Sequence, residues 1–170
     1  MDAPRLIDGM ARFGESVSAL VASLSREDFQ WKPPDGAWSI LEILCHLADE
    51  EVEDFRCRLE LALRDPSLDW PSIDPPHAAV ERRYNEHDPT ETVMRFVRER
   101  QRSVTWLRSL NTPDWNATKK HPRLGSMRAG DLLVSWAAHD ALHLRQIAKR
   151  LFQLALRNGA GYSSSYAGEW

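Results

Sequence analysis

Residues 136–147 read Trp-Ala-Ala-His-Asp-Ala-Leu-His-Leu-Arg-Gln-Ile and place His139 and His143 four positions apart. A helix puts side chains four apart on one face, one turn from each other. Both histidines fall within or beside the apolar stripe of this segment, which is centred on Leu132, Leu133, Trp136, Ile147 and Leu151. Imidazoles that face a core need a hydrogen-bond partner or a metal. The pattern therefore predicts a helix with either a metal-binding pair or two hydrogen-bonded histidines.

Three further segments have the apolar spacing of amphipathic helices, at about 3–24, 39–64 and 88–110. A residue suited to cap a helix precedes each of the four, and these residues are Asp2, Ser39, Asp88 and Ser126. The last helix is expected to end near Leu156. No segment alternates polar and apolar residues, so no strand is expected. Four helices of this length predict an all-α fold, a four-helix bundle.

Long loops are expected after the second and third helices, at 65–87 and 115–125. The first holds four prolines and little periodicity, so it either lines a site or makes a surface excursion. Trp31 and Trp38 flank a proline-containing loop that they are expected to anchor to the core. The chain is expected to form one domain, 1–170, with a flexible tail at about 160–170.

The composition excludes several classes of protein. The net charge is −3, with 42% hydrophobic and 28% charged residues, so nothing favours binding to nucleic acid or to an anionic membrane. No apolar run is long enough to span a bilayer. Cys45 and Cys57 are the two cysteines, too few for a disulfide scaffold. These features predict a cytoplasmic protein.

Other polar residues have less decisive positions. His46 lies away from the apolar stripe of its helix, which indicates a surface or rim histidine. Glu50 follows one turn later as a candidate metal ligand, hydrogen-bond acceptor or general base, with a solvated acid as the alternative. Gln146 could position a substrate or be a plain surface residue. His77, His87 and His121 lie in loops and are expected to be ordinary surface residues. Arg145 and Arg150 could bind a carboxylate or a thiol cofactor, or belong to a charged helix face.

Two motifs together resemble the DinB/YfiT-like superfamily. They are the stretch 31–49, WKPPDGAWSILEILCHLAD, and the stretch 139–147, HDALHLRQI, with Gly125-Ser126-Met127 between them. The resemblance covers nearly the whole chain and implies a four-helix bundle that binds one divalent metal through His46, His139 and His143. It thus changes the interpretation of His46 to a rim-facing ligand. Zinc or nickel is the expected ion, with iron or manganese as alternatives.

Three histidine ligands leave a coordination position for water or substrate, which is typical of catalytic sites. The resemblance implies a metal-dependent transferase that uses a low-molecular-weight thiol on small electrophiles. The position of Glu50, one turn past His46, makes it the candidate catalytic residue. The alternatives are a metal-dependent hydrolase or a non-catalytic, stress-related metal-binding module. A small-molecule substrate is expected. Seven tryptophans, an aromatic tail and the family resemblance predict a homodimer.

Overall fold

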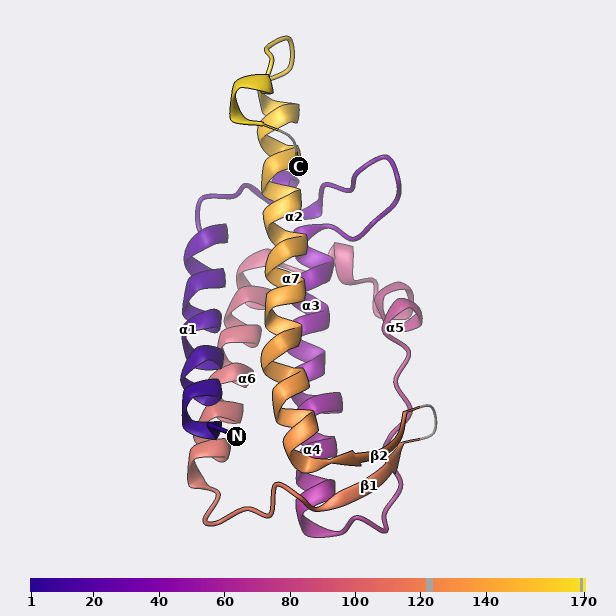
Figure 1. Ribbon diagram of the computed structural model, residues 1–170. Coiled ribbons are helices and arrows are strands. Elements are labelled where there is room, and N and C mark those ends of the chain that lie inside the picture. Colours follow the sequence, from indigo (N-terminus) through magenta and orange to yellow (C-terminus); the bar gives the residue numbers. More distant parts are fainter. Residues whose placement is uncertain (122–123, 169) are drawn as a thin grey trace.

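The computed structural model describes residues 1–121, 124–168 and 170, and four long helical segments pack side by side in it (Figure 1). Their bounds are Ala3–Val21 (α1), Ile40–Asp49 and Phe55–Arg64 (α3 and α4), Pro89–Ser109 (α6) and Ala129–Asn158 (α7). Helices α1 and α3 each contact both α6 and α7, so the four segments close a ring around a core. The predicted four-helix bundle is confirmed. Pro122, Arg123 and Glu169, which belong to the expected second loop and tail, lie outside the described residues.

Three of the four expected helix caps are confirmed. The side chains of Asp2, Ser39 and Asp88 each accept a hydrogen bond from the backbone amide three residues later. These bonds satisfy amides that have no partner within the helix. The cap expected at Ser126 is wrong, because Ser126 belongs to a strand and α7 begins at Ala129.

The first helix ends at Val21, earlier than expected, because a second helix starts close behind it. Ser25 caps this helix, α2 (Arg26–Gln30), through a reciprocal pair of hydrogen bonds with Asp28. The loop that follows packs Trp31 and Trp38 against the core, as expected.

The connection 65–87 is more structured than the sequence indicated. It contains α5 (Pro75–Glu81), capped by Asp74, and a 3₁₀ turn at Tyr84–Glu86. Prolines are tolerated in the first turn of a helix, because the backbone N–H groups of that turn have no acceptor within the helix. Ala79 is the one buried residue of α5, so no apolar period marks this helix in the sequence.

A short antiparallel hairpin precedes α7, so the expectation of no strand is wrong. Strand β1 (Thr118–His121) pairs with β2 (Gly125–Arg128), with Thr118 opposite Arg128. The buried position of β1 is Lys119, whose ammonium group donates to the carbonyl of Pro66 at 2.9 Å and lies over the ring of Trp70. A buried lysine gives no alternating apolar signal, which is why the pattern missed the hairpin.

The core consists of two apolar clusters with a polar layer between them. Along α7, Trp136 belongs to one cluster and Ile147 to the other, and His139, Asp140 and His143 lie between. The same order occurs on α6, where Arg100 lies between Phe96 and Val104. Burying polar groups at this level requires partners for each of them. The polar layer is therefore the part of the bundle where a site is built.

The C-terminal segment of the chain follows α7. The segment after α7 extends beyond the bundle in Figure 1 and turns back, so that the ring of Trp170 lies 5.6 Å from that of Phe152. The flexibility expected for this tail stays a prediction.

Within the described residues, none of the helices combines the length and apolarity needed to cross a membrane.

Candidate metal centre

Three histidines from two helices meet in the polar layer. His46 comes from α3, and His139 and His143 come from successive turns of α7. One ring nitrogen of each lies within 4.8 Å of the others, and the described residues contain this one group of three potential ligands. His46 and His143 are 6% and 5% exposed. The position of His46 on its helical wheel indicated a surface or rim histidine, and this expectation is wrong, since the packing of α3 against α7 encloses it.

A hydrogen bond fixes which nitrogen of His143 is free to bind a metal. His143 Nδ1 lies 2.8 Å from Gln146 Oε1, an oxygen that only accepts, so Nδ1 carries the proton. The Nε2 lone pair of His143 is thereby left for a ligand, the arrangement in which a second layer of groups orients metal-binding histidines. Glu50 is the corresponding neighbour of His46, with its Oε1 atom 3.5 Å from His46 Nδ1.

The protonation state of the histidines suits a cation. Burial, reinforced by the neighbouring histidines, lowers the pKa of His46 and of His139 to about 3. Burial also lowers the pKa of His143. His139 Nε2 and His143 Nε2 lie 3.0 Å apart. Two nitrogens that share a zinc ion at about 2.0–2.1 Å would be separated by about 3–3.4 Å. The three neutral rings therefore fit a divalent metal ion.

Aromatic side chains enclose the cluster. The ring of Trp38 lies 5.0 Å from that of His46, and the ring of Phe55 lies 5.1 Å from that of His139. Phe55 in turn stacks on Trp136 at 5.6 Å. These rings restrict the histidine rotamers and exclude water from one side of the cluster.

Glu50 is buried beside the histidines, so its interpretation as a solvated acid is wrong. It is 7% exposed and begins a π-helical turn, Glu50–Asp54, between α3 and α4. Turns of this type often occur at functional sites. Burial, with Asp54 as the next contributor, raises the pKa of Glu50 to about 9. Glu50 is not a member of the ligand group, so an ion held by the three histidines would have room for a further ligand.

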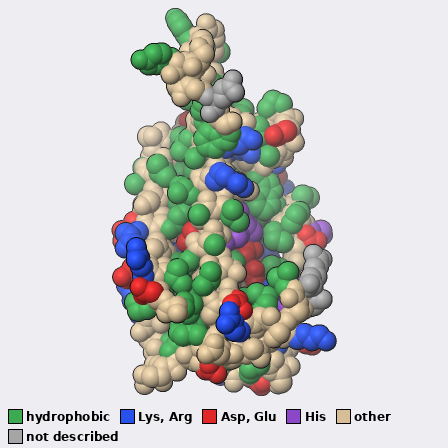
Figure 2. Space-filling model, in the orientation of Figure 1, with side chains coloured by type: hydrophobic (Ala, Val, Ile, Leu, Met, Phe, Trp, Pro, Cys, Tyr) green, Lys and Arg blue, Asp and Glu red, His purple; other side chains and the backbone are tan. Residues whose placement is uncertain are grey.

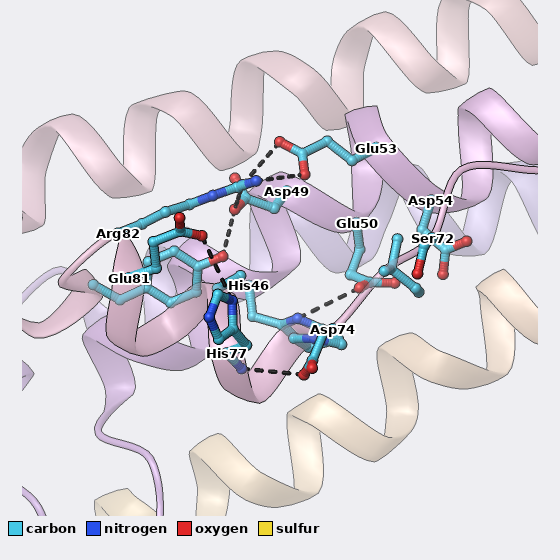
Figure 3. Close-up of a pocket in the computed structure, with 14 residues that line it drawn as sticks. His46, Asp49, Glu50, Glu53, Asp54, Ser72, Asp74, His77, Glu81 and Arg82 are labelled. Atoms are coloured by element: carbon cyan, nitrogen blue, oxygen red, sulfur yellow. Dashed lines mark hydrogen bonds and ion pairs between the residues drawn. The ribbon is translucent and has the colours of Figure 1, made fainter.

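A cavity of about 230 Å³ opens beside His46, between the π-helical turn and α5 (Figure 3). Its wall includes Glu50, Asp54, Asp74, His77 and Arg82. In the space-filling view, histidine and acidic side chains show through the middle of the face beside α7 (Figure 2). The connection 65–87 thus lines the site, which was one of its two expected roles.

Behind the histidines lies a buried ion network that the sequence did not reveal. Arg100 is 2% exposed and pairs with Glu51 and Asp140, the residue after His139. Trp136 Nε1 also donates to Glu51 Oε1 at 3.0 Å, whereas Glu51 Oε2 is buried without a hydrogen-bond partner. The one signal of this network in the sequence was the position of Arg100 on an otherwise apolar helix face. An arginine at such a position is equally typical of a solvated side chain.

Several residues that looked like surface side chains have defined contacts. Arg150 is 6% exposed and its Nε donates to the carbonyl of Trp38 at 2.7 Å. His77 is exposed but lines the cavity. His87 lies 3.6 Å from the buried thiol of Cys45. Arg145 is exposed, and Gln146, exposed as well, orients His143.

The geometry agrees with comparisons to known proteins. The family model described as the DinB superfamily matches residues 11–147. The chain belongs to the DinB superfamily.

Three known proteins resemble the chain over most of its length. Two proteins of Oceanobacillus iheyensis, each named a "putative metal-dependent hydrolase", are similar to it. One is 28% identical over 75% of this chain and 73% of its own length, and the other is 27% identical over 88% and 80%. The structure of YfiT from Bacillus subtilis, described as a four-helix bundle of unusual topology, superposes with a TM-score of 0.79. It is 16% identical and covers 90% of this chain and 87% of its own, which shows that the DinB-like fold is shared.

Proposed function

We propose that this protein is a metal-dependent hydrolase that cleaves a small substrate in the cavity beside His46. The observation that carries the proposal is the convergence of three neutral histidines beside that cavity, which His46 itself lines. The names of the two Oceanobacillus relatives support the same class of reaction. His46, His139 and His143 would hold the ion, with zinc or nickel preferred for imidazole ligands.

A divalent ion at such a site supplies Lewis acidity and lowers the pKa of a water molecule toward 7. The chain's own groups prepare the surroundings. Gln146 sets the tautomer of His143, Glu50 lies 3.5 Å from His46 Nδ1, and the rings of Trp38 and Phe55 shield one side from water. This preorganisation restricts the orientations of the histidine rings.

Glu50 is the proposed proton-transfer residue. Its buried carboxyl group holds a proton near neutral pH, since its pKa lies at about 9. Positive charge nearby lowers the pKa of a carboxyl group, and a group that titrates near the working pH can both accept and donate a proton. Glu50 borders both His46 and the cavity, which places it where a leaving group or an attacking water would need it.

The thiol-dependent transferase is less well supported by the cavity. A thiolate, and any carboxylate carried by a thiol cofactor, would enter a wall rich in Asp and Glu side chains. Negative charges at such short distances repel one another, and partial burial strengthens the repulsion. Structural zinc sites normally have four protein ligands, whereas three candidate ligands meet here. The non-catalytic metal module is therefore less well supported than the hydrolase.

The deciding experiment offers ester and amide substrates, and separately low-molecular-weight thiols with an electrophile, to metal-loaded protein. We expect hydrolysis that is lost in His143→Ala and retained in the surface control Gln101→Ala. Glu50→Gln should reduce the rate about 100-fold, as expected for loss of a proton-transfer group, without loss of metal. Thiol transfer without hydrolysis would favour the transferase. Equal background rates in wild type and His143→Ala, with lower thermal stability in the variant, would identify a structural metal.

A further inference from the structure

The loop between α2 and α3 has its conformation fixed at both ends. Gly36 adopts a left-handed backbone conformation, with a φ of 74°, and its amide closes a turn within the loop. The ammonium group of Lys32 and the backbone amide of Ser39 each donate to the carboxylate of Glu42, at 2.8 Å. Trp38, the residue before the cap of α3, is thereby held against the core.

Arg150 of α7 bonds the same tryptophan from the opposite side. Its Nε donates to the carbonyl of Trp38 at 2.7 Å, and its Nη1 contacts the side chain of Gln153. Arg150 is 6% exposed, and within the described residues no carboxylate lies at ion-pair distance from it. Burying a charged group without a counter-ion costs free energy. The hydrogen bond to Trp38 is therefore the specific contact that this buried arginine makes.

The ring of Trp38 connects this contact to the candidate metal centre. His46 lies seven residues after Ser39, about 10 Å along α3. The rings of Trp38 and His46 nevertheless have their centroids 5.0 Å apart, so the tryptophan side chain extends along α3 toward the histidine. A ring that lies this far from its own backbone moves when the backbone turns. The peptide group that Arg150 holds thus determines where the ring lies.

His46 depends on packing for its orientation more than the other two histidines do. His139 and His143 share one helix, and Gln146 bonds the ring of His143. His46 is the one ligand candidate on α3, and Glu50 Oε1 lies 3.5 Å from its Nδ1, which is long for a hydrogen bond. Contact with the ring of Trp38 is therefore a main constraint on the His46 ring.

We infer that Arg150 is a positioning residue of the metal centre, which acts through Trp38 on His46. This inference rests on the metal site of the proposed function and assigns control of metal affinity to a residue outside the ligand set. Arg150 follows His143 by seven residues, so both lie on the same face of α7. One helix thus supplies two candidate ligands and, across the bundle, orients the third. Binding sites require such support, because small displacements of a ligand reduce affinity.

A direct effect of the Arg150 charge on the metal would have the opposite sign. A nearby cation repels a divalent ion, so removing it would increase the affinity for metal. Positioning through Trp38 predicts a decrease in affinity, and it predicts that the decrease disappears once the ring of Trp38 has been removed. The sign of the effect and its coupling to Trp38 therefore separate the two mechanisms.

The test measures the zinc affinity of the full chain by competition with a chromophoric chelator. Arg150→Met and Arg150→Gln form a matched pair, because the atom in the place of Nε is a methyl group in one and an amide nitrogen in the other. We expect Arg150→Met to lower affinity about 10-fold, as is typical for loss of a group that orients a ligand. Arg150→Gln, which keeps a donor without the charge, should restore most of it. The control Arg145→Met removes an exposed arginine from α7 and should bind zinc like wild type.

A double-mutant cycle tests the route through the tryptophan. Trp38→Leu should lower zinc affinity by a similar factor, and adding Arg150→Met to it should cause no further loss beyond about twofold. A second readout uses the metal-free protein, in which the ring current of Trp38 displaces the NMR resonances of the His46 ring protons. These resonances should move in Arg150→Met and stay in place in Arg145→Met. Urea unfolding confirms that each variant is folded, and Trp38→Leu alone decides the question if Arg150→Met is not.

Several results would overturn the inference. Higher affinity in both Arg150→Met and Arg150→Gln would assign the effect to charge. A full additional loss in the double variant would show that the two residues act independently, and unchanged affinity in Trp38→Leu would remove the tryptophan from the route. Zinc binding that follows the expected series in a protein without hydrolytic activity supports the positioning role and removes the hydrolase alone. Absence of zinc binding in wild type overturns both.

Discussion

Arg100 and Asp140 form a buried two-point ion pair, in which Arg100 Nη2 lies 2.7 Å from Asp140 Oδ1 and Nη1 bonds the other carboxylate oxygen. Asp140 directly follows His139, so this pair connects α6 to the turn of α7 that presents a candidate metal ligand. Glu51 joins the same guanidinium from the π-helical turn next to Glu50. The polar layer thus fixes the relative positions of the three helices around the histidines.

Replacing Arg100 should destabilise the protein strongly. Arg100→Leu leaves Asp140 and Glu51 buried without their cation, which costs about 3–5 kcal/mol of unfolding free energy. Urea unfolding measures this change. The matched control is Arg12→Leu, which removes an exposed arginine from α1 and should change stability by less than about 0.5 kcal/mol. Equal effects of the two substitutions would contradict a structural role for the network.

Gln146 should control metal affinity although it is not a ligand. Gln146→Leu removes the acceptor of the His143 Nδ1 proton, and we expect affinity for zinc to fall about 10- to 100-fold. Competition with a chromophoric chelator gives the affinity. Gln146→Glu, which retains an acceptor, should restore much of it. Unchanged affinity in Gln146→Leu would show that the tautomer of His143 is set in another way.

The metal-free protein should lose stability as the pH falls from about 6.5. The folded-state pKa of His139 is about 3, below the ordinary value of 6.5, so between these values the unfolded chain binds the additional proton. Each such histidine destabilises the fold by up to about 1.4 kcal/mol per unit of decreasing pH. Urea unfolding between pH 7 and 4.5 should therefore show a steeper decline for wild type than for His139→Gln. Parallel curves would contradict the burial of an uncharged ring.

The two cysteines should differ in reactivity. Cys45 is fully buried, and burial raises the pKa of its thiol to about 11, so little thiolate forms near neutral pH. Cys57 is partly exposed. A thiol-specific reagent applied to the folded protein should modify Cys57 first, and Cys57→Ser should remove the rapid phase. Fast labelling that persists in Cys57→Ser would mean that the helix carrying His46 opens readily.

Self-association into a homodimer stays a prediction, which sedimentation can check. Large apolar side chains are exposed along α7 and beyond it, including Leu142 at 52% and Tyr162 at 91% (Figure 2). Exposed apolar surface of this kind favours association. We expect a species of twice the chain mass at tens of micromolar. Sedimentation as a 19.5 kDa monomer would contradict the dimer.

The sequence by itself determined the four long helical segments, because their signals are local. Apolar spacing and the caps at Asp2, Ser39 and Asp88 depend on residues within one or two turns of each other. The pairing of His139 and His143 follows from helical spacing in the same way. The place of His46 in the cluster came from the resemblance of its motif to a family, since its position on the helical wheel indicated the rim.

Only the tertiary structure decided what surrounds those residues. His46 and Glu50 became buried because α5, α7 and Trp38 pack over one side of α3, and no local pattern describes such contacts. The hairpin was hidden because its inward residue is Lys119, whose ammonium group finds carbonyl partners far along the chain. The charge of the cavity has the same origin, since its walls come from segments that meet only after folding. Burial and pKa depend on such long-range contacts, so the sequence and the family resemblance could name the candidate ligands but not their environment.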